Sequence, residues 1–423
     1  MEKKRPARLF IILLLGSLMT VSPFSIDMYL PAFSQIAKDF GTTPARISFS
    51  ITSYFIGLAV GQLLYGPLLD RFGRKRPLYF GLILYILACL GCMLSHSVEM
   101  LAGIRFIQAL GGCAALVAAT AMVRDFFPVE ESAKIFSLLI LILGLSPLLA
   151  PTLGGFITAW LGWQWVFIIL SIIVFLILMA LVFFLPEVHK PDTSISLAAR
   201  PMLAIFFSIL KNPQFYTYTL AGAFSFSAMF VYVAGSPVIY LDLFRISPQS
   251  YGGIFALIAV GFLGSNQLNV ALLRRYSPAQ LFYFGLLCQV IIGAVFLLGA
   301  LNNWYGIVAT TVLFFFFLSC LGLTYPNASA LALAPFTKNF GSASALLGFL
   351  QIGISGLISS GVGLLNPRGI APVTAMLAGI SVIAFLILLA GRKKLAADLS
   401  VSGAGADSGG ISGREGPSIG GIH

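Results

Sequence analysis

The chain contains 423 residues, of which 59% are hydrophobic and 9% are charged, and its mean hydropathy is +0.99. A soluble globular protein carries about 25% charged residues, so this composition excludes a soluble enzyme, a disordered protein and a disulfide scaffold. The net charge of +11 does not indicate nucleic-acid binding, because the basic residues lie in short clusters between apolar runs rather than in one patch.

Apolar runs that are long enough to cross a membrane recur along the chain. A transmembrane helix needs about 20 apolar residues to span about 30 Å of hydrocarbon. Twelve such runs are predicted, at residues 9–31, 45–69, 77–95, 99–122, 134–156, 163–185, 214–238, 250–272, 279–300, 304–326, 343–365 and 371–391. The first run follows a basic segment, as a signal peptide would. It is too long for one and carries Asp27, so we interpret it as an uncleaved span.

Lysine and arginine residues orient these spans. If the N-terminus is cytoplasmic, twenty Lys and Arg residues lie in cytoplasmic segments or at cytoplasmic span ends, four lie in outer loops or at outer span ends, and Arg105 lies well inside a span. Positively charged residues concentrate on the cytoplasmic side of membrane proteins. The sequence therefore predicts a multi-pass membrane protein with both termini in the cytoplasm.

The twelve spans divide into two sets of six. Ala59-Val60-Gly61 in the second span recurs as Ala259-Val260-Gly261 in the eighth, and both spans lead to basic clusters, which favours a duplicated bundle. The Gly/Ser-rich end of the chain is typical of disorder. The predicted organisation is an N-terminal six-helix bundle (1–187), a cytoplasmic linker (188–212), a C-terminal six-helix bundle (213–391) and a disordered cytoplasmic tail (392–423).

The residue constellations of soluble enzymes are missing from the sequence. The three histidines lie in a loop, in the linker and in the tail, so they cannot share a metal ion or serve an embedded catalytic triad. All five cysteines fall inside apolar runs, where they are packing residues. The sequence carries no Walker loop and no channel-filter signature. We therefore predict a gradient-driven transporter without enzymatic activity, metal or cofactor.

Two charged residues stand out because they lie inside predicted spans. A charge in mid-membrane costs at least about 2.5–3.5 kcal/mol on insertion scales and indicates a function. Asp27 lies four residues before the outer end of span 1, and Arg105 lies about six residues into span 4. Both are therefore predicted about 6–9 Å below the outer surface. They could share a water-filled cavity or an ion pair; the alternative is that both extend to the outer interface.

The loop between the second and third spans carries the most specific pattern. It reads Gly66-Pro-Leu-Leu-Asp70-Arg71-Phe-Gly73-Arg74-Lys75-Arg76. Gly66 allows a neighbouring helix to approach, and Gly73 allows a tight turn. Asp70 ends the span where it can cap a helix and pair with an arginine, while the basic triplet meets anionic lipid headgroups. An ordinary positive-inside turn is the alternative.

The fifth span contains several residues that disturb a helix, namely Gly144, Pro147, Pro151, Gly154 and Gly155. Two prolines in one span break or kink the helix, and the small residues permit close packing and bending. We interpret this span as a gate helix that bends; a simple kink is the alternative.

These segments together resemble the major facilitator superfamily of transporters. Loop 66–76 resembles the family's motif between spans 2 and 3, and Arg105-x-x-Gln108-x-x-Gly111-Gly112 resembles its span-4 motif. The span-5 segment Ala150-Pro151-x-x-Gly154-Gly155 is similar to that of its drug–proton antiporters. Ser25-Ile-Asp27-Met28-Tyr29-Leu30-Pro31 and Arg124-Asp125-Phe126 are similar to the Bcr/CflA multidrug exporters of bacteria. The second half departs from the loop motif, because it offers Asn269 and no carboxylate.

The resemblance implies an all-α membrane protein in which two pseudo-symmetric six-helix bundles surround a central cavity. It implies proton-coupled antiport that exports small, mostly apolar drugs or metabolites across the bacterial inner membrane by alternating access. Asp27 would bind and release the proton beside Arg105, and Asp70 with Arg71 would bridge the two halves. The cytoplasmic gate would consist of Gly66, Asp70, Arg71, Gly73, Arg74, Lys75 and Arg124, the last within reach of Asp70.

The implied cavity would be apolar with a few polar groups. Its predicted lining consists of polar and aromatic residues on stripes that face inward: Tyr54, Gln108, Phe226, Phe230, Tyr232, Tyr325, Asn327 and Gln351. The predicted partners are a small-molecule substrate, protons and the lipid bilayer, and the protein is predicted to act as a monomer.

Two other classes of protein stay open as alternatives. A proton-coupled metabolite importer of the same superfamily would carry extra charged residues in the second-half spans, and none is visible there. A membrane-embedded enzyme would need paired His, Asp or Glu residues at one depth, which the sequence lacks.

Overall fold

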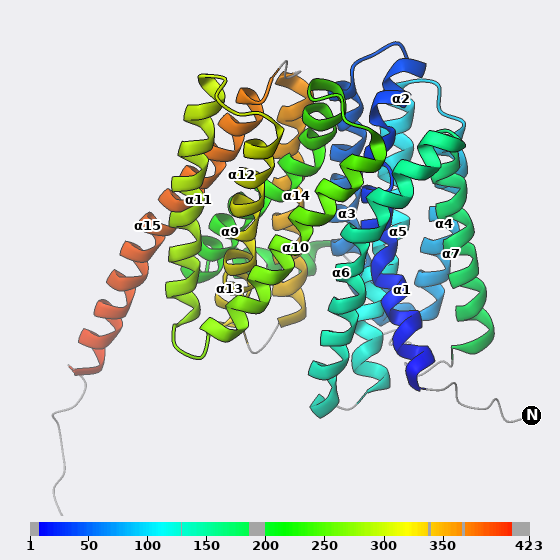
Figure 1. Ribbon diagram of the computed structural model, residues 1–423. Helices are drawn as coiled ribbons and strands as arrows, with labels where there is room; N and C mark the ends of the chain where they lie inside the picture. The colour runs from blue at the N-terminus through cyan, green and yellow to red at the C-terminus, as the bar shows by residue number, and fades with distance from the viewer. Residues whose placement is uncertain (1–7, 128, 186–198, 337–339, 366–368, 408–423) are drawn as a thin grey trace, which may run out of the picture.

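The computed structural model describes residues 8–127, 129–185, 199–336, 340–365 and 369–407, and this part of the chain consists of helices and short connections, without a β-strand (Figure 1). The first half contains α1 (Arg8–Asp27), η1 (Leu30–Ala32), α2 (Phe33–Asp39), α3 (Pro44–Phe72), α4 (Lys75–Met93), α5 (Val98–Phe126), α6 (Val129–Trp160) and α7 (Gln164–Phe184). After it come α8 (Ala199–Leu210), α9 (Pro213–Pro237), η2 (Val238–Leu243), α10 (Pro248–Leu272), α11 (Pro278–Leu301), α12 (Ile307–Ser319), α13 (Leu321–Leu333), α14 (Phe340–Leu365) and α15 (Ala371–Asp407).

The predicted spans are confirmed as helices. Eleven helical segments of the described chain are long and apolar enough to cross a membrane. The remaining predicted span, 134–156, lies within α6, a helix of 32 residues. Two spans differ in detail: the first continues through η1 and α2 to Asp39, and the tenth is divided at Cys320 into α12 and α13.

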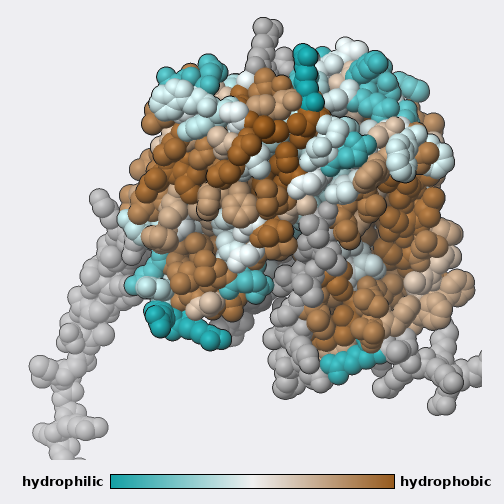
Figure 2. Space-filling view, viewed as in Figure 1, coloured by the Kyte–Doolittle hydropathy of each residue, from teal (hydrophilic) through white to brown (hydrophobic). Residues whose placement is uncertain are grey.

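The distribution of polar and apolar side chains is the one that a lipid environment requires. Hydrophobic residues cover the middle of the molecule, and hydrophilic residues gather at its top and bottom (Figure 2). Large apolar side chains such as those of Phe80 and Leu257 are exposed, while many Ser, Thr, Asn and Gln side chains are buried. Polar groups in a membrane must find partners inside the protein, so the interior carries the chemistry.

Capping residues determine where several spans begin. The side chains of Thr43, Ser97, Asn212, Ser247 and Ser277 each accept a hydrogen bond from a backbone N–H three residues later. Such a bond satisfies one of the amide groups that the first helical turn leaves unpaired. In α3, α9, α10 and α11 a proline follows the cap, where its fixed φ favours the helix.

The two sets of six spans repeat one packing pattern. In the first half α1 packs on α5, α6 and α7, while α4 packs on α5 and α7. In the second half α9 packs on α13, α14 and α15, while α11 packs on α13 and α15. In each half, therefore, the first span packs on the fourth, fifth and sixth spans, and the third span packs on the fourth and sixth. The fold is therefore a pair of pseudo-symmetric six-helix bundles, as predicted.

The N-terminal end of α1, the α3–α4 loop and the α10–α11 loop lie together at one end of the molecule (Figure 1). This end carries Arg8, the basic residues of segment 71–76, Arg274 and Arg275, and we call it the basic end. The opposite end is called the outer end. Neither name assigns an end of the molecule to a side of the membrane.

The halves meet chiefly where α3 packs on α14 and α6 packs on α10. On α3, residues spaced by three and four positions form a stripe toward α14: Ser48, Thr52, Phe55, Ala59 and Gln62. Their neighbours on α14 are Gly363, Ser359, Gly356, Gly353 and Gly348. The contacts are close: a methyl group on Gly356 would lie 2.9 Å from Cβ of Phe55. Small residues on α14 thus bring the two helices together.

This contact stops at Gln62, about three helical turns before α3 ends at Phe72. Gly66 is the next residue of the α3 stripe after Gln62, and a methyl group there would meet no described residue within 4 Å. In this conformation no described helix therefore approaches Gly66 as closely as the prediction requires. The lower edge of the molecule is correspondingly notched between the halves (Figure 2).

Helices extend into two predicted segments that lie outside the two bundles. Helix α8 lies within the predicted linker 188–212, and α15 continues to Asp407, into the predicted disordered tail. The extension past residue 391 is rich in Lys, Leu and Ala, which are strong helix formers, before glycines appear at residue 403. Residues 186–198 and 408–423 lie outside the described residues.

Candidate functional site

Arg105 on α5 is fully buried in the first half. Its Nη1 donates hydrogen bonds to the carbonyl oxygen of Ser25 (3.0 Å) and to Oε1 of Gln108 (2.7 Å). Its guanidinium lies over the rings of Tyr54 and Tyr29, at 4.3 and 4.6 Å from the ring centres. Nε and Nη2 of Arg105 have no hydrogen-bond partner. A buried cation that is only partly satisfied is costly, so it indicates a function.

Further polar groups surround this arginine and complete what we call the Arg105 site. The hydroxyl groups of Ser25 and Tyr85 are hydrogen-bonded to each other. Gln108 Nε2 donates to Sγ of Cys89 at 2.9 Å. The hydroxyl groups of Ser22 and Tyr54 lie near each other, and neither makes a hydrogen bond of good geometry with a described residue. The site therefore combines one cation, aromatic faces and several hydroxyl groups in a region without solvent contact.

Asp27 is the last residue of α1 and is 6% exposed. Its carboxylate makes neither a hydrogen bond nor an ion pair with another described residue. Of the two arrangements left open for Asp27 and Arg105, the ion pair is therefore not formed in this conformation. Arg105 is instead held on the carbonyl of Ser25, while Asp27 ends α1 just before η1, which contacts α9 and α10 of the second half. Both charged side chains are buried, so neither extends to the interface.

Aromatic rings from both halves meet beside this region. Phe55 of α3 packs on Phe230 of α9, with ring centres 3.9 Å apart. Phe226 of α9 contacts Phe230 at 5.4 Å and stacks on Tyr325 of α13 at 4.4 Å. We call Phe55, Phe226, Phe230 and Tyr325 the aromatic cluster. Three of the predicted lining residues are therefore brought together at the boundary between the halves.

The other predicted lining residues do not join this cluster. Tyr54 and Gln108 belong to the Arg105 site. Tyr232 is fully buried among aromatic rings. Gln351 Nε2 donates to Oγ of Ser329 at 3.4 Å. The predicted lining residues thus lie in several places in this conformation, because a helical stripe gives the face of each span but not the direction in which that face points within the bundle.

The α3–α4 loop forms a charge cluster at the basic end. Arg74 Nη1 donates to Oδ1 of Asp70 at 2.6 Å, and Arg74 Nε donates to Oδ2 of Asp125 at the end of α5 at 2.7 Å. Gly73 adopts φ +81°, a left-handed conformation that glycine accepts without strain. Burial opposes the charge on Arg74, but its hydrogen bonds with Asp125 and Asp70 outweigh burial and raise the pKa of the guanidinium. This cluster ties α3 to α5 within one half.

Asp125 belongs to this cluster, although no role was predicted for it from the sequence. It lies in the segment Arg124-Asp125-Phe126, and a carboxylate at the basic end of a span is the signal that could have singled it out. The predicted gate residue Arg124 has its side chain outside the described residues. Of the other predicted gate residues, Arg71 lies over the ring of Phe72 at 5.7 Å, and Lys75 begins α4.

The second half replaces the charges with amides. Asn327 Nδ2 on α13 donates to Oδ1 of Asn269 on α10 at 2.7 Å. By span order, α10 and α13 correspond to α3 and α5, which Arg74 connects in the first half. The sequence offers no carboxylate at this place in the second half, and the structure has a neutral amide pair there. The predicted lining residue Asn327 is thus hydrogen-bonded to Asn269.

The predicted gate helix α6 runs unbroken through Pro147 and Pro151. A break at these prolines is therefore wrong, since the helix continues on both sides of them. Gly154 and Gly155 allow close contact at the outer end: a methyl group on Gly155 would lie 2.7 Å from a carbonyl oxygen at the start of α10. Gly144 lies outside the residues whose surroundings are described.

We predict that the two carboxylates bound to Arg74 contribute unequally to the free energy of unfolding. The side chain of Asp125 is 15% exposed and that of Asp70 is 50% exposed. Asp125→Asn should lower the free energy of unfolding by about 1–3 kcal/mol, because it weakens a charge-assisted bond in a poorly hydrated place. Asp70→Asn should cost under about 1 kcal/mol. Thermal unfolding of the purified variants in detergent measures both; an equal loss for the two would contradict this order.

Comparison with known proteins agrees with this architecture. A family model described as Major Facilitator Superfamily matches residues 15–360. The chain belongs to the Major Facilitator Superfamily. A Bacillus subtilis protein named uncharacterized MFS-type transporter YdgK is 32% identical and is aligned over 88% of this chain and 92% of its own length. The bicyclomycin resistance protein homolog of Haemophilus influenzae is 30% identical over 92% and 98%, respectively.

The crystal structure of a D-xylose–proton symporter shares the fold, with a TM-score of 0.68 and 18% identity over 89% of this chain and 96% of that one. As a member of the Major Facilitator Superfamily, the protein is a multi-pass membrane transporter and not an enzyme. The resemblance to drug exporters of the Bcr/CflA type is confirmed by relatives that are named for resistance to drugs.

Proposed function

We propose that this member of the Major Facilitator Superfamily is a monomeric antiporter of the bacterial inner membrane. It exports small, mostly apolar drugs or metabolites in exchange for protons by alternating access. The observation that carries the proposal is the interface between the halves, which is packed from Ser48 to Gln62 and open at Gly66. A transporter that is closed at one end and open at the other is in one of its two access states.

The basic end is the cytoplasmic end in this proposal, because positively charged residues concentrate on that side of a membrane. The conformation described here then faces the cytoplasm. Transport would require the α3 stripe to close on α14 at Gly66 while the contacts at Ser48 and Gly155 open. Both termini lie in the cytoplasm, since α1 begins and α15 ends toward the basic end (Figure 1).

Asp27 is the proposed proton carrier. It is a buried carboxylate without a hydrogen bond or ion pair to another described residue, and it lies at the end of α1, next to the η1 segment that contacts the second half. When the halves move apart at the outer end, this carboxylate would leave its dry surroundings and meet water. Because burial favours the neutral acid and water favours the anion, that movement would couple proton release to the change of access. Arg105 would contribute a fixed positive charge nearby.

The substrate is proposed to bind between the Arg105 site and the aromatic cluster. The aromatic cluster offers apolar faces from both halves, and Tyr54 and Ser22 offer hydroxyl groups from the first half. Apolar walls with a few polar groups are typical of small-molecule sites. A relative that is named for bicyclomycin resistance supports a drug-like cargo.

Everted membrane vesicles test the proposal. With an acidic interior, protons leave through the antiporter and radiolabelled bicyclomycin should accumulate inside; a gradient of one pH unit supplies enough free energy for about tenfold accumulation per proton. A protonophore should abolish this uptake, and vesicles without the protein give the background. Uptake into right-side-out vesicles with acid outside, and none into everted ones, would instead identify an importer.

A further inference from the structure

We propose that an anionic phospholipid binds in an apolar groove on the outside of the first half, in the leaflet at the basic end. One acyl chain occupies the groove between α3 and α4, and the lipid phosphate binds Arg76 at the mouth of the groove. This site is separate from the transport pathway between the halves, and its occupancy does not depend on the proposed substrate or on proton coupling.

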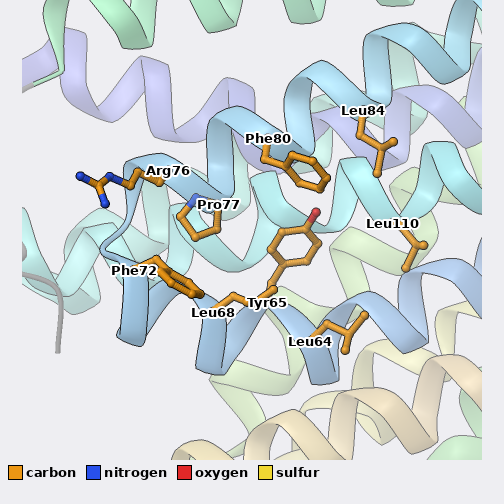
Figure 3. Close-up of a pocket in the computed structure, with 9 residues that line it drawn as sticks. All are labelled: Leu64, Tyr65, Leu68, Phe72, Arg76, Pro77, Phe80, Leu84 and Leu110. Atoms are coloured by element: carbon orange, nitrogen blue, oxygen red, sulfur yellow. The ribbon is translucent and has the colours of Figure 1, made fainter. Parts of the chain in front are cut away.

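The groove has a volume of about 400 Å³ and an almost wholly apolar lining (Figure 3). Tyr65 and Leu68 of α3 form one wall, Pro77 and Phe80 of α4 form the other, and Leu110 of α5 lies between the helices. The ring of Phe80 lies opposite that of Tyr65 across the groove. Apart from the hydroxyl group of Tyr65 and the side chain of Arg76 at the mouth, the lining is apolar. An apolar cavity does not hold ordered water, so a hydrocarbon chain is the occupant that suits it.

The groove exists because of how three helices pack. Both α3 and α4 lie along α5 and make little contact with each other. Gly81 permits the close approach of α4 to α5, since a methyl group there would press on Cβ of Ala114. The side chains of Phe80 and Leu64, which are 65% and 47% exposed, flank the opening and give it a lipid-facing position. The opening therefore faces the bilayer rather than the space between the halves.

The mouth of the groove carries a positive charge. Arg76 is exposed, makes no ion pair with a described residue, and extends away from the apolar lining (Figure 3). The lining residue Leu84 lies eight positions further along α4, about 12 Å from Arg76 along the helix axis. A cation at the interface with an apolar channel running into the membrane matches the two parts of an anionic phospholipid. Basic pockets between transmembrane helices bind such headgroups.

Native mass spectrometry of the purified protein tests the site with phosphatidylglycerol and phosphatidylcholine that carry the same acyl chains. Leu68→Trp fills the groove and should remove most of the retained phosphatidylglycerol. Leu268→Trp is the matched control: it lies on α10 at the position that the repeated Ala-Val-Gly segment aligns with Leu68, and it is 54% exposed. Retention by this control should equal that of the parent.

The headgroup is tested separately. Arg76→Gln should weaken retention of phosphatidylglycerol by about fivefold, the effect of one basic residue at an anionic surface, and should leave phosphatidylcholine unchanged. Arg275→Gln removes an exposed charge from the corresponding end of the second half and should change neither lipid. Equal retention by Leu68→Trp and Leu268→Trp would overturn the groove. Equal binding of the two lipids by the parent, unaltered in Arg76→Gln, would overturn the anionic assignment. Arg76 is exposed, so its replacement should not affect folding.

Discussion

Asp27→Asn should abolish pH-driven accumulation of drug while the variant still binds drug and exchanges it passively. Asparagine keeps the size and hydrogen-bonding capacity of the side chain but cannot take up or release a proton at physiological pH. Asp27 is also the carboxylate that lies buried at the boundary between the halves without an ion pair. If it carries the proton, the accumulation ratio in everted vesicles should fall from about tenfold per pH unit to about one.

Asp242→Asn is the matched control for this experiment. Asp242 lies in η2 near the outer end and is exposed, so the same chemical change there should leave accumulation at the parental level. Counterflow of labelled drug without a pH gradient shows that the Asp27→Asn protein is folded and binds its substrate. Parental pumping by Asp27→Asn would show that the proton travels by another group, with Arg105 the next residue to test.

Gly66→Leu should hold the transporter in the conformation described here. Gly66 continues the α3 stripe that faces α14, and the space beside it is empty in this state. Closing the basic end would bring α14 against this position, where a leucine side chain would overfill the contact at a cost of about 1–3 kcal/mol. The closed state would therefore lose about five- to 150-fold in population, and transport should fall accordingly while thermal stability is kept.

Spin labels on cysteines at positions 76 and 275, introduced after the native cysteines are replaced, report the opening of the basic end. The parent should show two distance populations that respond to pH, and Gly66→Leu should show the longer one alone. Gly264→Leu serves as control, because Gly264 is exposed on α10 and also has nothing within 4 Å. A short distance in the Gly66→Leu protein, or equal loss of transport in the control, would contradict the assignment of Gly66 to the closing surface.

The sequence alone determined the number, order and approximate ends of the spans. Whether a segment enters lipid depends on its own length and hydropathy, so each span could be recognised without knowledge of its neighbours. Local signals also identified loop 66–76, where Gly73 makes the turn and Asp70 pairs with an arginine. The same holds for Asp27 and Arg105, because a charge inside an apolar run is visible wherever the helix lies.

The tertiary structure decided which of these residues meet. Arg105 binds the carbonyl of Ser25 and two aromatic faces instead of Asp27. Asp125, 51 positions from Arg74, became its second acceptor. The sequence could not give these pairs, because they depend on the rotation of each helix about its axis and on its neighbours, which packing of the whole bundle determines. The state of access is likewise a property of the interface between halves: Gln62 touches α14 and Gly66, one turn on, does not.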